Sequence, residues 1–197
     1  MGKDRLAAFS DGVIAVIITI MVLELKVPAT PDWSALKSLV PGFFSYGLSF
    51  IYVAIYWNNH HHLLHTVKHV DGAILWANTH LLFWLSLIPL TTAWMQQFPY
   101  TSAPAAIYGL ILLMAAIAYF ILQNLIICSQ GKGSLLKQAL GRDLKGKISP
   151  LLYITGIGFA FISPLLSYLI YSGVALLWLV PDRRIERTIN QSASREI

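Results

Sequence analysis

The chain has 197 residues, of which 56% are hydrophobic and only 12% are charged, whereas an ordinary globular domain has about 25% charged residues. A water-soluble fold needs more charge to cover its surface, and so apolar a chain is not intrinsically disordered. A disulfide scaffold is excluded because Cys128 is the only cysteine. The formal net charge of +5 admits either nucleic-acid binding or loop charges that orient membrane helices. Composition therefore predicts an all-α, polytopic membrane protein.

Several apolar stretches approach the length of about 20 residues that a helix needs to cross a bilayer. The last of them, residues 148–180, carries no charge, and at about 1.5 Å per residue it is too long for one span. Pro164 would end a helix near its middle, which predicts a tight hairpin of two short spans. We expect a single transmembrane domain over residues 1–197, with six spans at residues 6–25, 39–57, 73–95, 105–128, 148–162 and 165–180.

The basic residues test this layout, because loops on the cytoplasmic side are enriched in Lys and Arg. Only Lys26 and Lys37 fall on the other side of a six-span arrangement. Both termini are therefore expected in the cytoplasm, with the chain in the plasma membrane and no nucleic-acid partner. Residues 129–147 could form a short amphipathic helix, and residues 182–197 a charged tail. The twelve basic residues on the cytoplasmic side are Lys3, Arg5, Lys68, Lys132, Lys137, Arg142, Lys145, Lys147, Arg183, Arg184, Arg187 and Arg195.

The first span has two differently loaded faces. Its Asp11 lies inside the apolar stretch and no clean cleavage site follows, so we expect a retained span rather than a signal peptide. At 100° per residue, four residues spaced i, i+3, i+4 and i+7 point well away from Asp11. Such a stripe usually reflects ordinary helix packing. The stripe consists of Val16, Thr19, Ile20 and Leu23.

A carboxyl group at membrane depth is costly, so Asp11 must find a partner or stay protonated. Polar residues at the ends of the second and third spans lie at the same predicted depth. We hypothesise one buried network in which histidines partner the carboxyl group, since a satisfied network rigidifies packing. Its predicted members are Ser10, Asp11, His60, His61 and Asn78.

A run of histidines follows the second span. His61, His65 and His69 recur at i, i+4 and i+8, a spacing that could hold a transition metal. No cysteine lies nearby and no carboxylate occurs before Asp71, so we expect neither a bound metal nor another cofactor. A secondary transporter for metal ions or protons that uses these histidines remains the alternative function.

The segment Thr155–Phe159 reads Thr-Gly-Ile-Gly-Phe and invites comparison with a potassium-channel filter. The order of residues differs from T-V-G-Y-G, so we interpret these glycines as sites of close helix contact. Gly42, Gly47 and Gly109 receive the same interpretation. The chain contains no G-x-S-x-G, P-loop or H-E-x-x-H motif, and we expect no enzymatic activity.

Three motifs resemble the prokaryotic transmembrane protein 175 family of potassium-permeable cation channels. Its first helix is matched by Arg5-x-x-x-Phe9-Ser10-Asp11-Gly12 followed by Leu23-Glu24-Leu25-Lys26-Val27-Pro28. The end of its second helix resembles Trp57-x-x-His60-His61-x-Leu63, although His62 stands where the family often has a basic residue. Positions on its third helix resemble Asp71, Asn78 and Pro89.

The resemblance implies a homotetramer in the lipid bilayer whose four first helices line a pore for K⁺, without a T-V-G-Y-G filter. It implies that large apolar side chains form a constriction and that a hydroxyl layer contributes to selectivity. Carried onto this chain, these positions are Val16, Thr19, Ile20 and Leu23. The resemblance also implies that Arg5, Phe9, Ser10 and Asp11 form a structural anchor, supported by Trp57, His60, His61 and Asn78.

Overall fold

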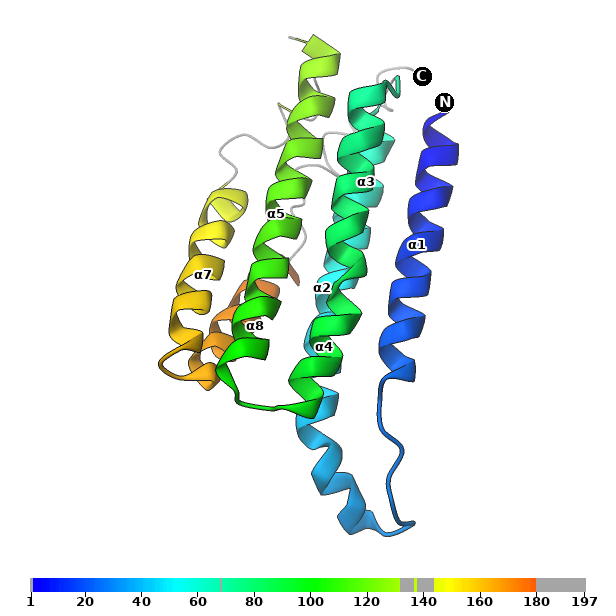
Figure 1. Cartoon of the computed structure of the whole chain (residues 1–197). Coiled ribbons are helices and arrows are strands. Elements are labelled where there is room, and N and C mark those ends of the chain that lie inside the picture. Colours follow the sequence, from blue (N-terminus) through cyan, green and yellow to red (C-terminus); the bar gives the residue numbers. More distant parts are fainter. Residues whose placement is uncertain (1, 68, 132–136, 138–143, 180–197) are drawn as a thin grey trace.

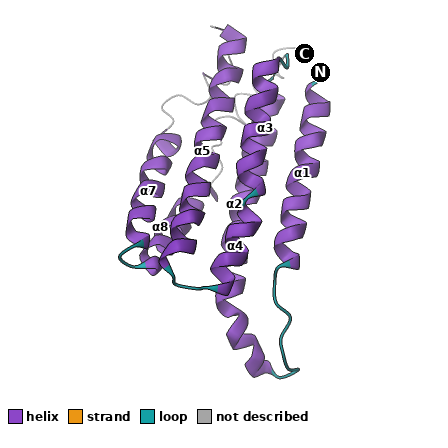
Figure 2. Cartoon of the chain, viewed as in Figure 1, coloured by secondary structure: helices purple, strands orange, loops and turns teal. Residues whose placement is uncertain are grey.

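The structure is a computed structural model that describes residues 2–67, 69–131, 137 and 144–179. The described residues form helices and loops without a β-strand, which confirms the all-α membrane fold (Figures 1 and 2). The elements are α1 (Lys3–Leu23), the 3-10 helix η1 (Trp33–Leu39), α2 (Val40–His65), α3 (Gly72–Ser86), α4 (Ile88–Gln97), α5 (Ser102–Gln130), α7 (Leu144–Ala160) and α8 (Pro164–Leu179).

Helices occupy all six stretches predicted as spans. α7 and α8 have 17 and 16 residues, so each is about 25 Å long, shorter than the hydrocarbon core of about 30 Å. They form the predicted hairpin, and Pro164 is the first residue of α8. Within the described residues, the segments long and apolar enough to cross a membrane are Lys3–Leu23, Trp33–His65, Gly72–Gln97 and Ser102–Gln130.

Two elements differ most from their predicted ranges. The third predicted span is two helices end to end, because the helix is interrupted at Leu87 and α4 starts with Ile88 and Pro89. Proline has no backbone N–H and therefore fits the first turn of a new helix. α2 continues to His65 instead of ending at residue 57, because polar side chains end an apolar stretch without interrupting the backbone hydrogen bonds of a helix.

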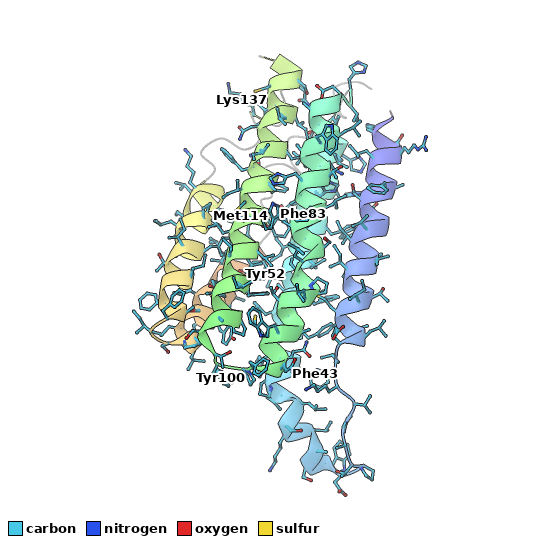
Figure 3. All side chains as sticks on the ribbon, viewed as in Figure 1. Phe43, Tyr52, Phe83, Tyr100, Met114 and Lys137 are labelled. Atoms are coloured by element: carbon cyan, nitrogen blue, oxygen red, sulfur yellow. The ribbon has the colours of Figure 1, made fainter. Side chains whose placement is uncertain are left out.

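Successive membrane segments run in opposite directions along the bundle, with α3 and α4 together forming one segment. α1 lies at one edge and α7 at the opposite edge (Figure 1). α1 packs on α2, α3 and α4, whereas α5 packs on α3, α4, α7 and α8. η1 and the start of α2 project beyond the other helices at the end opposite to the N-terminus (Figure 1). Figure 3 shows Tyr52 within the bundle, and Phe43 and Tyr100 towards that projecting end.

The described basic residues are divided between the two ends of the bundle as predicted. Lys3 and Arg5 begin α1 at the same end as the start of α7, which carries Lys145 and Lys147 (Figure 1). Lys26 and Lys37 lie at the opposite end, between α1 and α2. The remaining predicted cytoplasmic charges Lys68, Lys132, Arg142, Arg183, Arg184, Arg187 and Arg195 lie outside the described residues, as do most of segment 129–147 and the predicted tail.

Tyr171 of α8 packs closely against a glycine on each of two neighbouring helices. A Cβ atom at Gly109 of α5 or Gly156 of α7 would overlap the Tyr171 ring. The Tyr171 hydroxyl donates to the Ala105 carbonyl (3.2 Å), and the Tyr171 carbonyl accepts from the Tyr52 hydroxyl (2.6 Å). Close contact is therefore confirmed at Gly109 and Gly156. No atom lies within 4 Å of a Cβ built at Gly47 or Gly158, and at Gly42 it would make only ordinary contact with Gln96.

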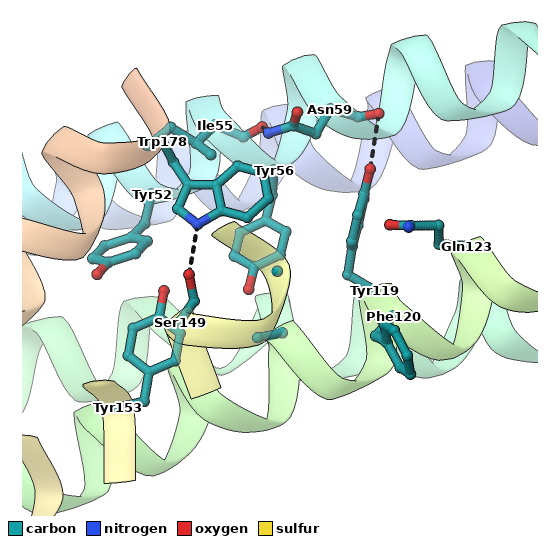
Figure 4. Close-up of a pocket in the computed structure, with 12 residues that line it drawn as sticks. Tyr52, Ile55, Tyr56, Asn59, Tyr119, Phe120, Gln123, Ser149, Tyr153 and Trp178 are labelled. Atoms are coloured by element: carbon teal, nitrogen blue, oxygen red, sulfur yellow. Dashed lines mark hydrogen bonds between the residues drawn. The ribbon is translucent and has the colours of Figure 1, made fainter. Parts of the chain in front are cut away.

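The filter-like segment lies inside α7 and is helical, as interpreted from its sequence. The Thr155 hydroxyl donates to the Leu151 carbonyl of the preceding turn (2.8 Å). A cavity lies between α2, α5, α7 and α8, where Trp178 donates to the Ser149 hydroxyl (2.8 Å) (Figure 4). Half of its lining residues are aromatic, and the lining contains neither a formally charged side chain nor a residue of α1, so the cavity is separate from the face described next.

Candidate pore-lining face of α1

One face of α1 is fully packed against the rest of the chain. Its residues recur at spacings of three and four, which places them on one side of a helix. None of these side chains exposes more than 3% of its surface. They are Leu6, Ser10, Ile14, Ile17 and Met21.

The predicted stripe lies on the uncovered part of α1. Val16 is 57% exposed, Ile20 43% and Leu23 76%, and Thr19 is exposed as well. A row of branched apolar side chains is therefore left largely uncovered by the rest of the described residues. Such a face is free to contact lipid, another subunit or the lumen of a pore.

Thr19 presents its oxygen in a defined way. Its hydroxyl donates to the Ala15 carbonyl one turn earlier (2.9 Å). Because the single hydroxyl proton is directed at the helix, the oxygen lone pairs remain for groups outside it. The stripe thus offers an acceptor for a cation between two large apolar positions.

Behind the stripe, α1 is held by a directional chain of hydrogen bonds. The Asn78 side-chain amide donates to the Ser10 hydroxyl (3.0 Å), which donates to the Leu6 carbonyl (2.9 Å). The Asn78 oxygen therefore faces His60 Nε2 at 2.6 Å, which makes His60 the donor. Ser10 and Asn78 are completely buried and His60 is 1% exposed. Every member has a partner, so the network fixes how α1, α2 and α3 meet.

Asp11 has a different partner from the one predicted. The Trp57 indole N–H donates to its carboxylate (2.9 Å), and the histidine of the network bonds to Asn78 instead. His61 does not bond into the network either: it is exposed, lies beside Trp57 and shares a hydrogen bond with His65. The buried network is therefore smaller than predicted, and Asp11 is held separately at its edge.

Of the four motif residues on α1, two bond to neighbouring helices and two do not lie in the packed interface. Ser10 and Asp11 bond to α3 and α2. Arg5 is exposed and Phe9 is 58% exposed. Periodicity places both on the same side of α1 as Val16 and Leu23, so any anchoring role for them requires contacts with groups other than the described residues.

Sequence reasoning missed two features. It did not identify the indole of Trp57 as the donor to Asp11, although Trp57 ends the second predicted span at the depth of that carboxyl group. It also grouped His61 and His65 with His69 and did not indicate that His61 and His65 hydrogen bond to each other. Among the residues that the structure describes, no group of three or more potential metal ligands is present.

Comparisons with known proteins identify the family of the chain. The family model described as the endosomal/lysosomal potassium channel TMEM175 matches residues 5–89, which include most of α1 and the residues of α2 and α3 that bond to it. A protein from Chryseobacterium sp. (strain P1-3), described as a potassium channel, is 53% identical over 192 residues, 98% of this chain and 100% of that protein. The chain belongs to the TMEM175 family.

Other TMEM175 relatives are more distant. A protein from Streptomyces collinus described as a potassium channel is 33% identical over 125 residues, which are 59% of this chain and 61% of that protein. The crystal structure of a lysosomal potassium-selective channel TMEM175 homolog from Chamaesiphon minutus has 28% identity and a TM-score of 0.77, covering 91% of this chain and 97% of that one. TMEM175 is a channel family, and the chain is accordingly not an enzyme.

Proposed function

We propose that the chain is a potassium-permeable cation channel, built as a homotetramer with four α1 helices around the pore. The observation that carries the proposal is the uncovered apolar stripe of α1, with its outward hydroxyl oxygen, on a helix whose opposite face is fully packed. Similarity over the whole chain to a protein described as a potassium channel supports it. Two cavities within the described residues contain no residue of α1, and in this proposal the pore lined by α1 forms between subunits.

The constriction is a set of rings of apolar side chains, one from each subunit. Val16, Ile20 and Leu23 supply them, because they are the large exposed residues of the stripe. A narrow apolar ring gates by dewetting: water leaves the constriction and ions cannot cross without their hydration shell. Widening the ring restores water and conduction.

Selectivity comes from Thr19 and not from backbone carbonyls. Four hydroxyl oxygens replace part of the hydration shell of K⁺, and their lone pairs face outward because each proton is bonded to Ala15. No T-V-G-Y-G segment occurs in the sequence. With few strong dipoles, discrimination of K⁺ from Na⁺ is modest.

The buried network keeps α1 at a fixed rotation while its other face is wet. Ser10, Asn78 and His60 bond α1 to two helices through buried side chains, so the stripe points reproducibly to the pore. The bundle ends carry the charge asymmetry of a chain with cytoplasmic termini in the plasma membrane. K⁺ is the permeant ion, and no cofactor and no nucleic acid take part.

Recording from the purified full chain in planar bilayers tests this function. A discrete K⁺ conductance is expected, together with a particle that contains four copies of the 21.9 kDa chain by mass measurement in detergent. Metal or proton uptake that depends on His61 and His65, without any discrete conductance, would instead support the secondary transporter.

A further inference from the structure

Two histidine rings face each other in the last turn of α2. The Nε2 atoms of His61 and His65 are 3.1 Å apart and the ring centroids are 4.4 Å apart. Both side chains are exposed, and α2 ends at His65, beyond the apolar part of the span. The pair is therefore reachable from water.

We propose that His61 and His65 chelate one divalent transition-metal ion of the class that prefers imidazole, such as Zn²⁺, Ni²⁺ or Cu²⁺. Metal–nitrogen bonds to histidine are about 2.0–2.1 Å long. Two such bonds to nitrogens 3.1 Å apart enclose an angle of about 100° at the ion, between square-planar and tetrahedral values. The separation of the two Nε2 atoms that allows a hydrogen bond in the absence of metal therefore also suits chelation of one ion. The backbone does not have to move for the ion to bind.

The neutral rings bind metal through the nitrogens that carry no proton. In the hydrogen-bonded pair one Nε2 carries the proton that the other accepts, so the ion takes the place of that proton, and the donor ring changes to the tautomer that carries its proton on Nδ1. Hard cations such as Mg²⁺ and Ca²⁺ prefer oxygen ligands and are excluded by this donor set.

The helix end that carries the pair is held rigidly. The Thr66 hydroxyl donates to the Leu63 carbonyl (2.7 Å), and the Gln130 side chain of α5 donates to the Thr66 carbonyl (2.5 Å). Leu63 and Leu64 are buried beneath the pair. The rings therefore lose little freedom when they bind an ion, and water completes its coordination.

Two contacts connect the His61–His65 pair to α1, the helix proposed to line the pore. The His61 ring lies 6.0 Å from the Trp57 ring, and the Trp57 indole donates to Asp11 of α1. An ion that fixes the His61 ring also restricts Trp57, and through it the cytoplasmic end of α1. Bound metal is therefore expected to change the current, and this second step rests on the proposed function.

Binding is tested on the full chain, purified through an affinity tag that contains no histidine. A chelator first removes any bound metal from the protein. Titration with NiCl₂ should saturate at one ion per chain. Because even removal of a residue that only supports a metal ligand costs about 10–100-fold in affinity, His61→Ala and His65→Ala should each weaken binding about tenfold or more. His69→Ala is the matched control and should bind as the unaltered chain does.

Wild-type affinity in His65→Ala, or an equal loss in His69→Ala, would overturn the chelate. Saturation at half an ion per chain would also overturn it, because the ion would then bridge two copies. Since binding is measured without any current, these outcomes can be read even if the chain conducts no K⁺.

The coupling is tested by adding NiCl₂ to the cytoplasmic side during recording. The K⁺ current of the unaltered chain should change and that of His65→Ala should not, with similar currents in both before the metal is added. A saturated chain whose current stays the same would overturn the coupling through Trp57 and leave the binding site in place.

Discussion

α1 and α5 are both strongly apolar helices, yet they differ in how much of their surface the rest of the chain buries. In their most apolar 18-residue windows, 28% of residues are buried in α1 and 50% in α5. α5 packs on four neighbouring helices, and the glycine at position 109 lets Tyr171 lie against it. α1 packs on three helices with one narrow face.

This difference shows that hydropathy indicates whether a helix lies in the membrane. It does not indicate whether the apolar side chains pack inside the chain or stay uncovered. In α5 they fill the interior of the chain, with lipid on the remaining face. In α1 a polar network holds one face while the apolar stripe stays uncovered. Variants in the two helices should therefore affect different properties, stability for α5 and conduction for the stripe of α1.

The largest effect on stability is expected at the contact between α5 and Tyr171. In Gly109→Ala the new Cβ overlaps the Tyr171 ring, so the ring must move and its hydroxyl loses the bond to Ala105. Overpacking of this kind costs about 1–3 kcal/mol, occasionally more. Thermal unfolding in detergent measures it. Gly158→Ala is the control, because its Cβ meets no atom within 4 Å; equal loss in both variants would contradict this packing.

The next effect concerns the polar attachment of α1. Asn78→Leu leaves the His60 N–H without its acceptor and the Ser10 hydroxyl without its donor. A buried unsatisfied group costs about 1–3 kcal/mol, so the free energy of unfolding should fall by about that amount. Thr79→Ala, next to it but exposed and bonded only within its helix, should change little. A variant Asn78→Leu as stable as the unaltered chain would show that the network does not hold α1.

The stripe should respond in conductance with little change in stability. Leu23 is 76% exposed in the single chain, and Leu23→Ala should widen the proposed constriction and raise single-channel conductance. Leu110→Ala removes an exposed leucine from α5 (41%) and should leave conductance unchanged. If Leu23→Ala conducts like the unaltered chain, Leu23 is not part of the gate; if both variants conduct more, the effect is not specific to α1.

The smallest expected effect is on ion preference. Thr19→Val keeps the shape of the side chain but removes the oxygen, so the preference for K⁺ over Na⁺ should fall, seen as a shifted reversal potential under bi-ionic conditions. Thr155→Val on α7 is the matched control and should leave the reversal potential unchanged. Thr155 is also exposed and also donates to the carbonyl one turn earlier. A reversal potential that does not move in Thr19→Val would reject the role of this hydroxyl.

Part of this architecture could be predicted because its causes are local. Apolar length and charge placement predicted the helices and their alternation, since a helix in lipid satisfies its own backbone hydrogen bonds. Pro164 predicted the hairpin of α7 and α8. The break at Leu87 was not predicted, because proline can be accommodated inside a membrane helix when neighbours compensate, and only the packed structure shows that α4 begins anew.

Partners of the polar side chains could not be derived in the same way. Periodicity and the cost of burying a polar group are properties of one helix, so they predicted which face of α1 is apolar, that Asp11 needs a partner and that Ser10, His60 and Asn78 share one depth. The packed helices show in addition that Trp57 binds Asp11, that His61 pairs with His65 and that the stripe of Val16, Ile20 and Leu23 stays uncovered. Those outcomes depend on the rotation and axial shift of three helices relative to one another, which the pattern along any one of them does not fix.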